Sequence, residues 1–97
     1  MRAELRNLYA DAMVEGSAAA LTLGRDRTAA RLAENAVMAN DVREDAVIAL
    51  VRALQACGRG EEALRQRRAY ETRVAHRAGP RRRASGATAD VAARGEP

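Results

Sequence analysis

Residues 53–65 of the chain read ALQACGRGEEALR, and residues 19–31 read AALTLGRDRTAAR. Each stretch runs from small and apolar residues into a Gly-Arg pair, and the two pairs, Gly24-Arg25 and Gly58-Arg59, stand at the same place in their stretches. Glycine permits the left-handed turn that ends a helix, and the alanine five residues after each glycine lets two helices approach closely. These two stretches therefore predict two helical hairpins, repeated along the chain.

Outside these turns, the spacing of apolar residues at three and four positions predicts helices throughout. The expected helices cover residues 5–23, 26–40, 44–57 and 61–79. Gly24 and Gly58 should end the first and the third helix, and Gly79-Pro80 should end the fourth. A further turn is expected near Asn40-Asp41. Asp26 is a plausible cap of the second helix, and Asp41 with Glu44 three residues later has the pattern of a capping box before the third.

The core should be formed by one apolar stripe on each helix. The stripe of the first helix is expected to contain Leu5, Leu8, Tyr9, Ala12, Met13, Gly16, Ala19, Ala20 and Leu23. The third helix carries the strongest stripe, formed by Val47, Leu50, Val51, Leu54 and Cys57. Ile48 lies off this stripe, so either the third helix is buried on two sides, which we favour, or Ile48 is an exposed contact.

Composition and period together define the expected fold. The chain has 97 residues, which is room for one domain, and it has no Phe or Trp and only two Tyr, so its core should be thin. The interval from Gly24 to Gly58 matches the tetratricopeptide repeat, a helix hairpin of about 34 residues. We therefore expect an all-α, tetratricopeptide-like, right-handed stack of two antiparallel hairpins over residues 1–79. Residues 80–97, which begin with an arginine run, are expected to form a disordered basic tail.

Charge is distributed unevenly along the chain. All the basic residues are arginine; residues 59–83 carry a net charge of +6, whereas residues 1–58 and 84–97 carry −1 each. Such a patch attracts acidic proteins or phosphate backbones, although it is also what a solvated helix face looks like. No apolar run is long enough for a membrane helix and no secretion signal is visible, so we expect a cytoplasmic protein without membrane contact.

No set of residues in the chain predicts catalysis. Cys57 and His76 are the only residues of their kinds, and neither has an activating neighbour; Cys57 is expected in the core and His76 in solvent. The chain has no phosphate-binding glycine loop and too few ligands for a structural zinc site. We expect no enzymatic activity, no cofactor and no metal.

Three stretches resemble the bacterial transcriptional activator domain, the tetratricopeptide-like domain of actinobacterial regulators of the SARP and AfsR-like group. They are residues 32–37, LAENAV, residues 41–46, DVREDA, and residues 53–65. The family loop commonly reads Pro-Leu-Arg-Glu-Glu/Asp; here Asp41-Val42 replaces Pro-Leu, while residues 43–45 match it. Tyr70 and residues 77–79 resemble the last helix of the family, so the resemblance covers about residues 2–79.

The resemblance implies the interaction domain of a transcriptional regulator. The winged helix-turn-helix that precedes this domain in the family is not expected here, because the repeat already begins at Leu5. The implied partner is a protein: a full-length regulator, a second copy or the transcription machinery. The rival hypothesis is a nucleic-acid-binding accessory protein that uses the arginine-rich fourth helix and the tail; against it, the chain has no aromatic stacking set and no recognition-helix motif, so sequence-specific DNA binding is not expected.

Two surfaces are candidates for partner binding. One is the arginine face of the fourth helix, formed by Arg65, Arg68, Arg73 and Arg77. The other is the concave groove of the stack, expected to be lined by Glu4, Asn7, Asp11, Arg43, Ile48 and Arg52.

Overall fold

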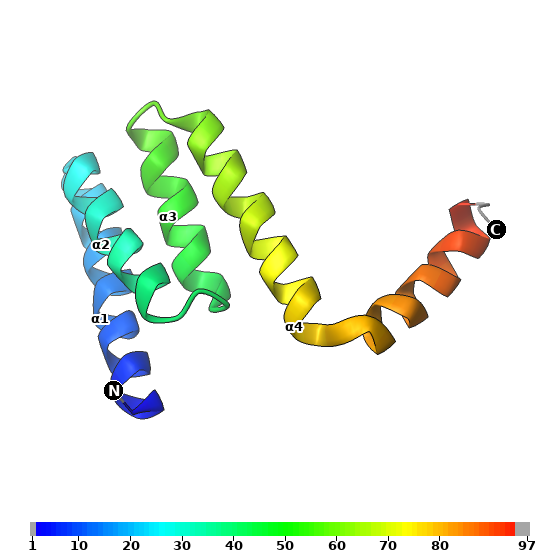
Figure 1. The fold of residues 1–97 in the computed structure, drawn as a ribbon. Helices are drawn as coiled ribbons and strands as arrows, with labels where there is room; N and C mark the ends of the chain where they lie inside the picture. Colours follow the sequence, from blue (N-terminus) through cyan, green and yellow to red (C-terminus); the bar gives the residue numbers. More distant parts are fainter. Residues whose placement is uncertain (1, 95–97) are drawn as a thin grey trace.

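A computed structural model describes the backbone of residues 2–94 and the side chains of residues 2–77. Within residues 2–94 the chain is all-helical, with four helices and no strand. The helices are α1 (Ala3–Thr22), α2 (Asp26–Ala39), α3 (Glu44–Ala56) and α4 (Gly60–Arg94). Each helix packs beside the preceding one in the opposite direction, and α1 also contacts α3 (Figure 1). The predicted helical class and the three predicted turns are confirmed.

The turns at Gly24 and Gly58 have the same backbone geometry. The φ angles are 76° at Gly24 and 79° at Gly58, in the left-handed region that favours glycine. The amide of Arg25 donates to the carbonyl of Ala20, and the amide of Arg59 donates to that of Leu54, both at 2.8 Å. This six-residue bond is the Schellman closure of a helix end. The period read in the sequence is therefore also a repeat of the backbone hydrogen bonds.

The core lies between the helices and is built mainly from alanine. Its central cluster contains Ala20, Ala29, Ala30, Ala33, Leu50, Ala53, Leu54 and Ala63. Small side chains bring α1 and α2 close together: a Cβ atom added at Gly16 would lie 3.2 Å from Leu32 Cδ1. In the same seam the buried Ser17 hydroxyl donates to the carbonyl of Ala29 at 2.9 Å. The predicted stripe of α3 does supply the core, with Leu50 and Leu54 fully covered.

The apolar stripe predicted to be the buried face of α1 is wrong for most of its residues. Leu5, Leu8, Tyr9 and Leu23 are exposed, and the buried residues of the helix are Ala10, Ser17 and Ala20. The helix is turned so that its small side chains face α2 and α3, because these permit close backbone approach. Four of its large apolar side chains are left on the outside, whereas Leu21 packs against the core.

The predicted caps are also corrected. Asp26 and Glu44 are the first residues of α2 and α3, and the capping positions, Arg25 and Arg43, make no side-chain capping bond. In the turn before α3 the Asn40 side chain makes the local side-chain bond to the backbone: its Oδ1 accepts from the amide of Val42 at 3.3 Å. Both acidic residues still lie in a first turn, where the helix dipole favours them.

The predicted stop of the fourth helix at Gly79-Pro80 is wrong, because α4 continues to Arg94. A proline inside a helix removes one backbone N–H and crowds an earlier carbonyl, which bends the helix. Figure 1 shows such a change of direction where the ribbon passes from yellow to orange. The side chains of residues 78–97 lie outside the described part, so the division into residues 1–79 and a disordered tail of residues 80–97 stays a prediction.

Candidate functional site

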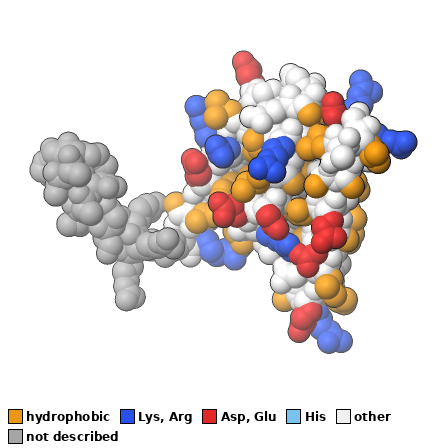
Figure 2. Space-filling model, turned by 180° about the vertical axis from the view of Figure 1, so that it is seen from behind, with side chains coloured by type: hydrophobic (Ala, Val, Ile, Leu, Met, Phe, Trp, Pro, Cys, Tyr) orange, Lys and Arg blue, Asp and Glu red, His pale blue; other side chains and the backbone are white. Residues whose placement is uncertain are grey.

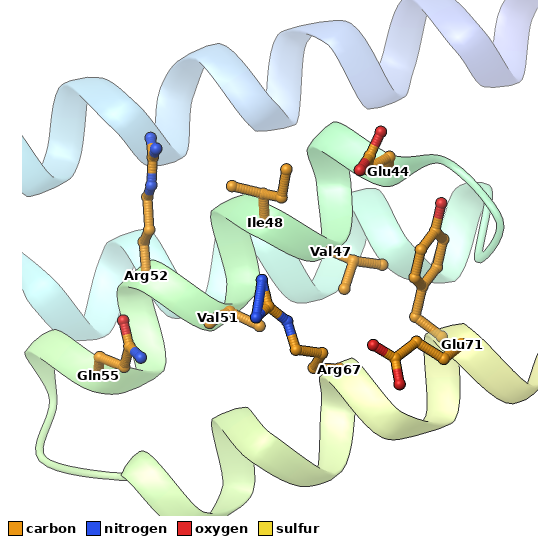
Figure 3. A pocket seen from close by; sticks show the side chains of 9 residues that line it. Glu44, Val47, Ile48, Val51, Arg52, Gln55, Arg67 and Glu71 are labelled. Atoms are coloured by element: carbon orange, nitrogen blue, oxygen red, sulfur yellow. The ribbon is translucent and has the colours of Figure 1, made fainter. Parts of the chain in front are cut away.

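A groove of about 430 Å³ opens between α3 and α4. Nine side chains from both helices line it (Figure 3). They are Glu44, Val47, Ile48, Val51, Arg52, Gln55, Arg67, Tyr70 and Glu71. We call this surface the α3–α4 groove. It combines apolar side chains with charged groups of both signs.

Ile48 and Arg52 were predicted to lie together in a groove, and both line this one. Ile48 is 36% exposed, so it contributes to the groove surface and is not covered by a second layer. Burial of α3 on two sides, which we favoured from the sequence, is therefore incomplete. The groove lies between α3 and α4, whereas the sequence placed it between the first and the third helix.

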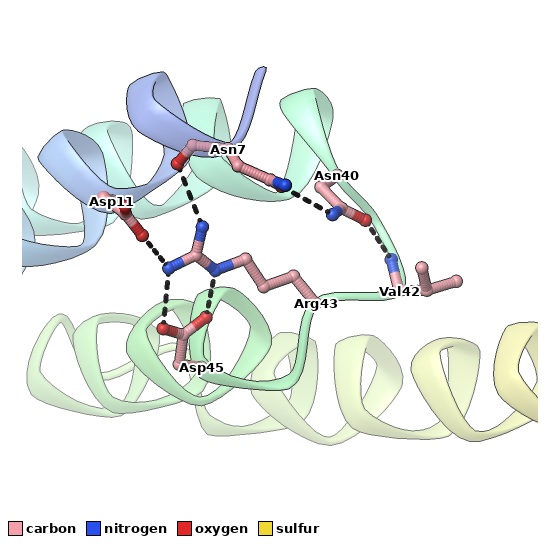
Figure 4. A network of polar contacts seen from close by, with 6 residues as sticks. All are labelled: Asn7, Asp11, Asn40, Val42, Arg43 and Asp45. Carbon is pink, nitrogen blue, oxygen red and sulfur yellow. Dashed lines mark hydrogen bonds and ion pairs between the residues drawn. The ribbon is translucent and has the colours of Figure 1, made fainter. Parts of the chain in front are cut away.

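The other predicted groove residues form an internal network around Arg43 (Figure 4). The guanidinium of Arg43 pairs with Asp11 of α1 and donates from Nε to Asp45 at 2.6 Å and from Nη1 to the Asn7 carbonyl at 3.1 Å. Asn40 adds a side-chain bond to Asn7 at 3.4 Å. The network joins the start of α3 to α1, so Arg43 and Asp11 hold the hairpins together. Glu4 is exposed and lies outside this network.

Charge shifts the acid–base properties of this network. The hydrogen bonds from Arg43 hold the pKa of Asp45 below its usual value, against the opposing effect of burial. The same bonds, to Asp45 first and to Asp11 second, raise the pKa of Arg43 above its usual value. Arg43 therefore stays charged at every accessible pH, and Asp45 loses its charge only in acid below its usual range.

The four predicted arginines of α4 differ in their surroundings. Arg65, Arg68 and Arg77 are exposed. Arg73 is half-buried and donates from Nε to the carbonyl of Asp41 at 2.8 Å, with the Asp41 carboxylate 3.5 Å away. Its Nη2 is shielded from solvent without a hydrogen-bond partner. Arg73 therefore ties α4 to the α2–α3 turn, whereas the other three have no ion-pair partner within the described residues.

On the face of the molecule drawn in Figure 2, charged side chains of one sign do not gather into a patch. Arginine and acidic side chains are interspersed there, and hydrophobic side chains are exposed between them.

The remaining candidate groups offer no second site. Cys57 is half-buried and packs against the core, as predicted, and His76 is exposed. No group of three or more histidine, cysteine or acidic residues gathers in a metal-binding arrangement within the described residues. In the same part of the chain, no helix combines the length and the apolarity needed to cross a membrane.

The sequence reasoning missed several groove residues, including all those contributed by α4. Arg67 and Tyr70 face the groove together with Glu71. The signal was present in the repeat: at the equivalent positions of the first hairpin stand Ala33, Ala36 and Val37, on the face of α2 that helps to form the core. The sequence did place Tyr70 and Arg67 on the inner face of the fourth helix, but not in a groove.

The fold and the groove define a class of protein: antiparallel helix hairpins, each closed by a glycine turn, with an open surface between the last two helices. The bacterial transcriptional activator domain family matches residues 1–91, and the chain belongs to this family. Membership links the chain to transcription regulation. Comparison with curated proteins gave no match, and neither did comparison with solved structures.

Proposed function

We propose that this chain is a protein-interaction module of a bacterial transcriptional regulator, built as a tetratricopeptide-like stack of two hairpins. The module binds a protein, catalyses no reaction and acts in the cytoplasm, where transcription takes place. The packing of α1 against α3 supports the stack, because first helices of successive hairpins contact one another in such repeats.

The α3–α4 groove is the observation that carries this proposal. Ile48 and Val51 supply apolar area from α3, and Arg52 and Arg67 are exposed at the same surface. An apolar centre with charged groups around it is the usual anatomy of a protein interface. The amphipathic face of a partner helix fits this chemistry.

Affinity capture with matched baits tests the proposal. The immobilised full chain is compared with Ile48→Glu, which places a charge in the groove, and with Met38→Glu at a position that is 82% exposed and outside it. We expect regulators or components of the transcription machinery to be retained by the wild-type chain and by Met38→Glu, and to be lost with Ile48→Glu. Equal capture by all three baits would exclude the groove as the binding surface.

A second candidate function is nucleic-acid binding through α4. It is favoured by Arg65, Arg68 and Arg77, which are exposed on one helix. Titration with duplex DNA at several salt concentrations decides between the two. A regulatory protein-binding module shows at most weak binding that is the same for any sequence. Tight binding to one sequence, with a steep loss of affinity as salt rises, would support the alternative.

A further inference from the structure

The α3–α4 groove is equivalent to a surface that is covered in the first hairpin. A shift by one repeat, which places Gly58 onto Gly24, also places Val51, Arg67 and Tyr70 onto Ser17, Ala33 and Ala36. These three earlier residues are fully buried, on the hairpin that receives α3. Arg67 is exposed and Tyr70 is half-buried, because no helix packs on the second hairpin at the equivalent place within the described residues. The groove is thus a helix-receiving surface that has no helix on it.

The same shift identifies a surface that would fit the groove. The outer stripe of α1 is formed by Leu8, Ala12, Ala19 and Leu23, and the shift places these onto Val42, Ala46, Ala53 and Cys57. Ala46 and Ala53 are 0% exposed, because they lie on the face that α3 packs against the rest of the molecule. Leu8 is 63% exposed and Leu23 is 70% exposed. The outer stripe of α1 therefore has the chemistry of a packed helix face but is not covered.

We propose that the outer stripe of α1 in one copy of the chain docks in the α3–α4 groove of a second copy, so that the copies stack head to tail and continue the repeat. This inference rests on the proposed function and names the partner of the groove as the chain itself. α1 would then occupy in the second copy the place that α3 occupies on the first hairpin.

Charge supports this pairing. Glu15, on the exposed side of α1, is equivalent to Ala49, and Ala49 packs against the core cluster that contains Ala33. Since Ala33 is equivalent to Arg67, docking places Glu15 on the same contact face as Arg67, where their opposite charges attract. Within the described residues neither of these two side chains has an ion-pair partner in the isolated chain.

The two surfaces are different and lie on different helices, so the contact is heterologous and cannot form a closed two-fold dimer. A pair of copies still presents one free outer stripe and one free groove. Assembly should therefore grow beyond the dimer as concentration rises, which distinguishes it from a symmetric dimer.

Sedimentation velocity of the full chain, from micromolar to millimolar concentrations, tests the proposal. We expect the average mass of the wild type to rise past that of two chains. Leu8→Glu, which disables the stripe, and Ile48→Glu, which disables the groove, should each remain monomeric, whereas the control Met38→Glu should assemble like the wild type. Mixed in equal amounts, the two disabled variants should form a heterodimer and nothing larger, because each retains the surface that the other has lost.

A charge exchange tests the pairing without placing a charge in an apolar contact. Glu15→Arg and Arg67→Glu should each weaken self-association at least tenfold, roughly, and the double variant should restore it. Three results would overturn the proposal. The wild type could stay monomeric at millimolar concentration, or it could form a dimer that grows no further while the mixed Leu8→Glu and Ile48→Glu variants fail to associate. The third is a double variant, Glu15→Arg with Arg67→Glu, that does not regain self-association. Self-association could be absent while capture of another protein still depends on Ile48. The proposed function as a protein-interaction module would then remain supported, and only the identification of the partner as a second copy would be wrong.

Discussion

Arg43 shows what a single side chain does in this fold. It is the residue before α3, and its guanidinium reaches Asp11 and Asn7, which lie 32 and 36 residues earlier in the chain. The sequence marked Arg43, Asp11 and Asn7 as members of one surface, which the structure brings together. It could not show that they bind one another, because pairing over such separations depends on the packing of α1 against α3.

Acid should weaken this network through Asp45. Its pKa lies below the usual value of about 3.9, so the stability that it contributes is present above that pH and is lost as pH falls through the lowered pKa. The side chain is 52% exposed, so the contribution is below about 1 kcal/mol. We expect Asp45→Asn to be less stable than the wild type in urea at pH 7, and this difference to shrink as the pH falls through the lowered pKa of Asp45.

Glu44→Gln is the control for this titration, since Glu44 occupies the same helical turn but makes no bond to Arg43 in the structure. A constant difference between Asp45→Asn and the wild type from pH 7 to pH 2 would show that the ion pair contributes nothing.

At the scale of elements, the glycine turns fix where helices end. Gly58 has a φ of 79° and no atom lies within 4 Å of the position of an added Cβ, so only backbone conformation opposes a side chain there. Gly58→Ala should cost about 1–2 kcal/mol of unfolding free energy. Gly60 lies at the start of α4 and has equally open space around it. Gly60→Ala should therefore leave the unfolding free energy unchanged or raise it slightly. Thermal melts of the two variants measure the difference, and equal melting temperatures would contradict the assignment.

The ends of helices were easier to predict than their faces. Gly24 and Gly58 mark turns by a local rule, and the turns lie where the sequence placed them. The face of α1 was misassigned because counting apolar residues gives weight to Leu8 and Leu23, whereas the helix packs through Ala10 and Ser17. Which of two faces is covered depends on the helices available to cover it, and the sequence pattern of one helix does not contain that information.

At the scale of the whole molecule, one small core supports all four helices. Leu54 is 0% exposed and belongs to a cluster to which every helix contributes. Leu54→Ala should remove about 2–5 kcal/mol, a large part of the roughly 5–15 kcal/mol that stabilises a typical domain. We expect the helical circular dichroism signal to be lost in one transition at a clearly lower temperature, whereas Met38→Ala melts like the wild type. Separate transitions for the two hairpins would show that they fold independently.

The groove was only partly predictable at this scale. Ile48 and Arg52 could be found from α3 alone, but Arg67 and Tyr70 join them only when α4 is packed alongside. The arginine face of α4 was read from charge, and charge does not reveal that Arg73 is already bonded to Asp41. Composition therefore identified the helix that carries the guanidinium groups, and tertiary structure decided which of them are free.

The alanine core has a consequence for how this protein responds to temperature. Unfolding exposes little hydrocarbon per residue, because most of the fully covered side chains are single methyl groups. The heat capacity of unfolding follows exposed apolar area, so it should fall below the usual value of about 12–15 cal/mol/K per residue. A small heat capacity flattens the curve of stability against temperature. The fold should therefore be modest in its maximum stability but nearly constant across the range in which a bacterium grows.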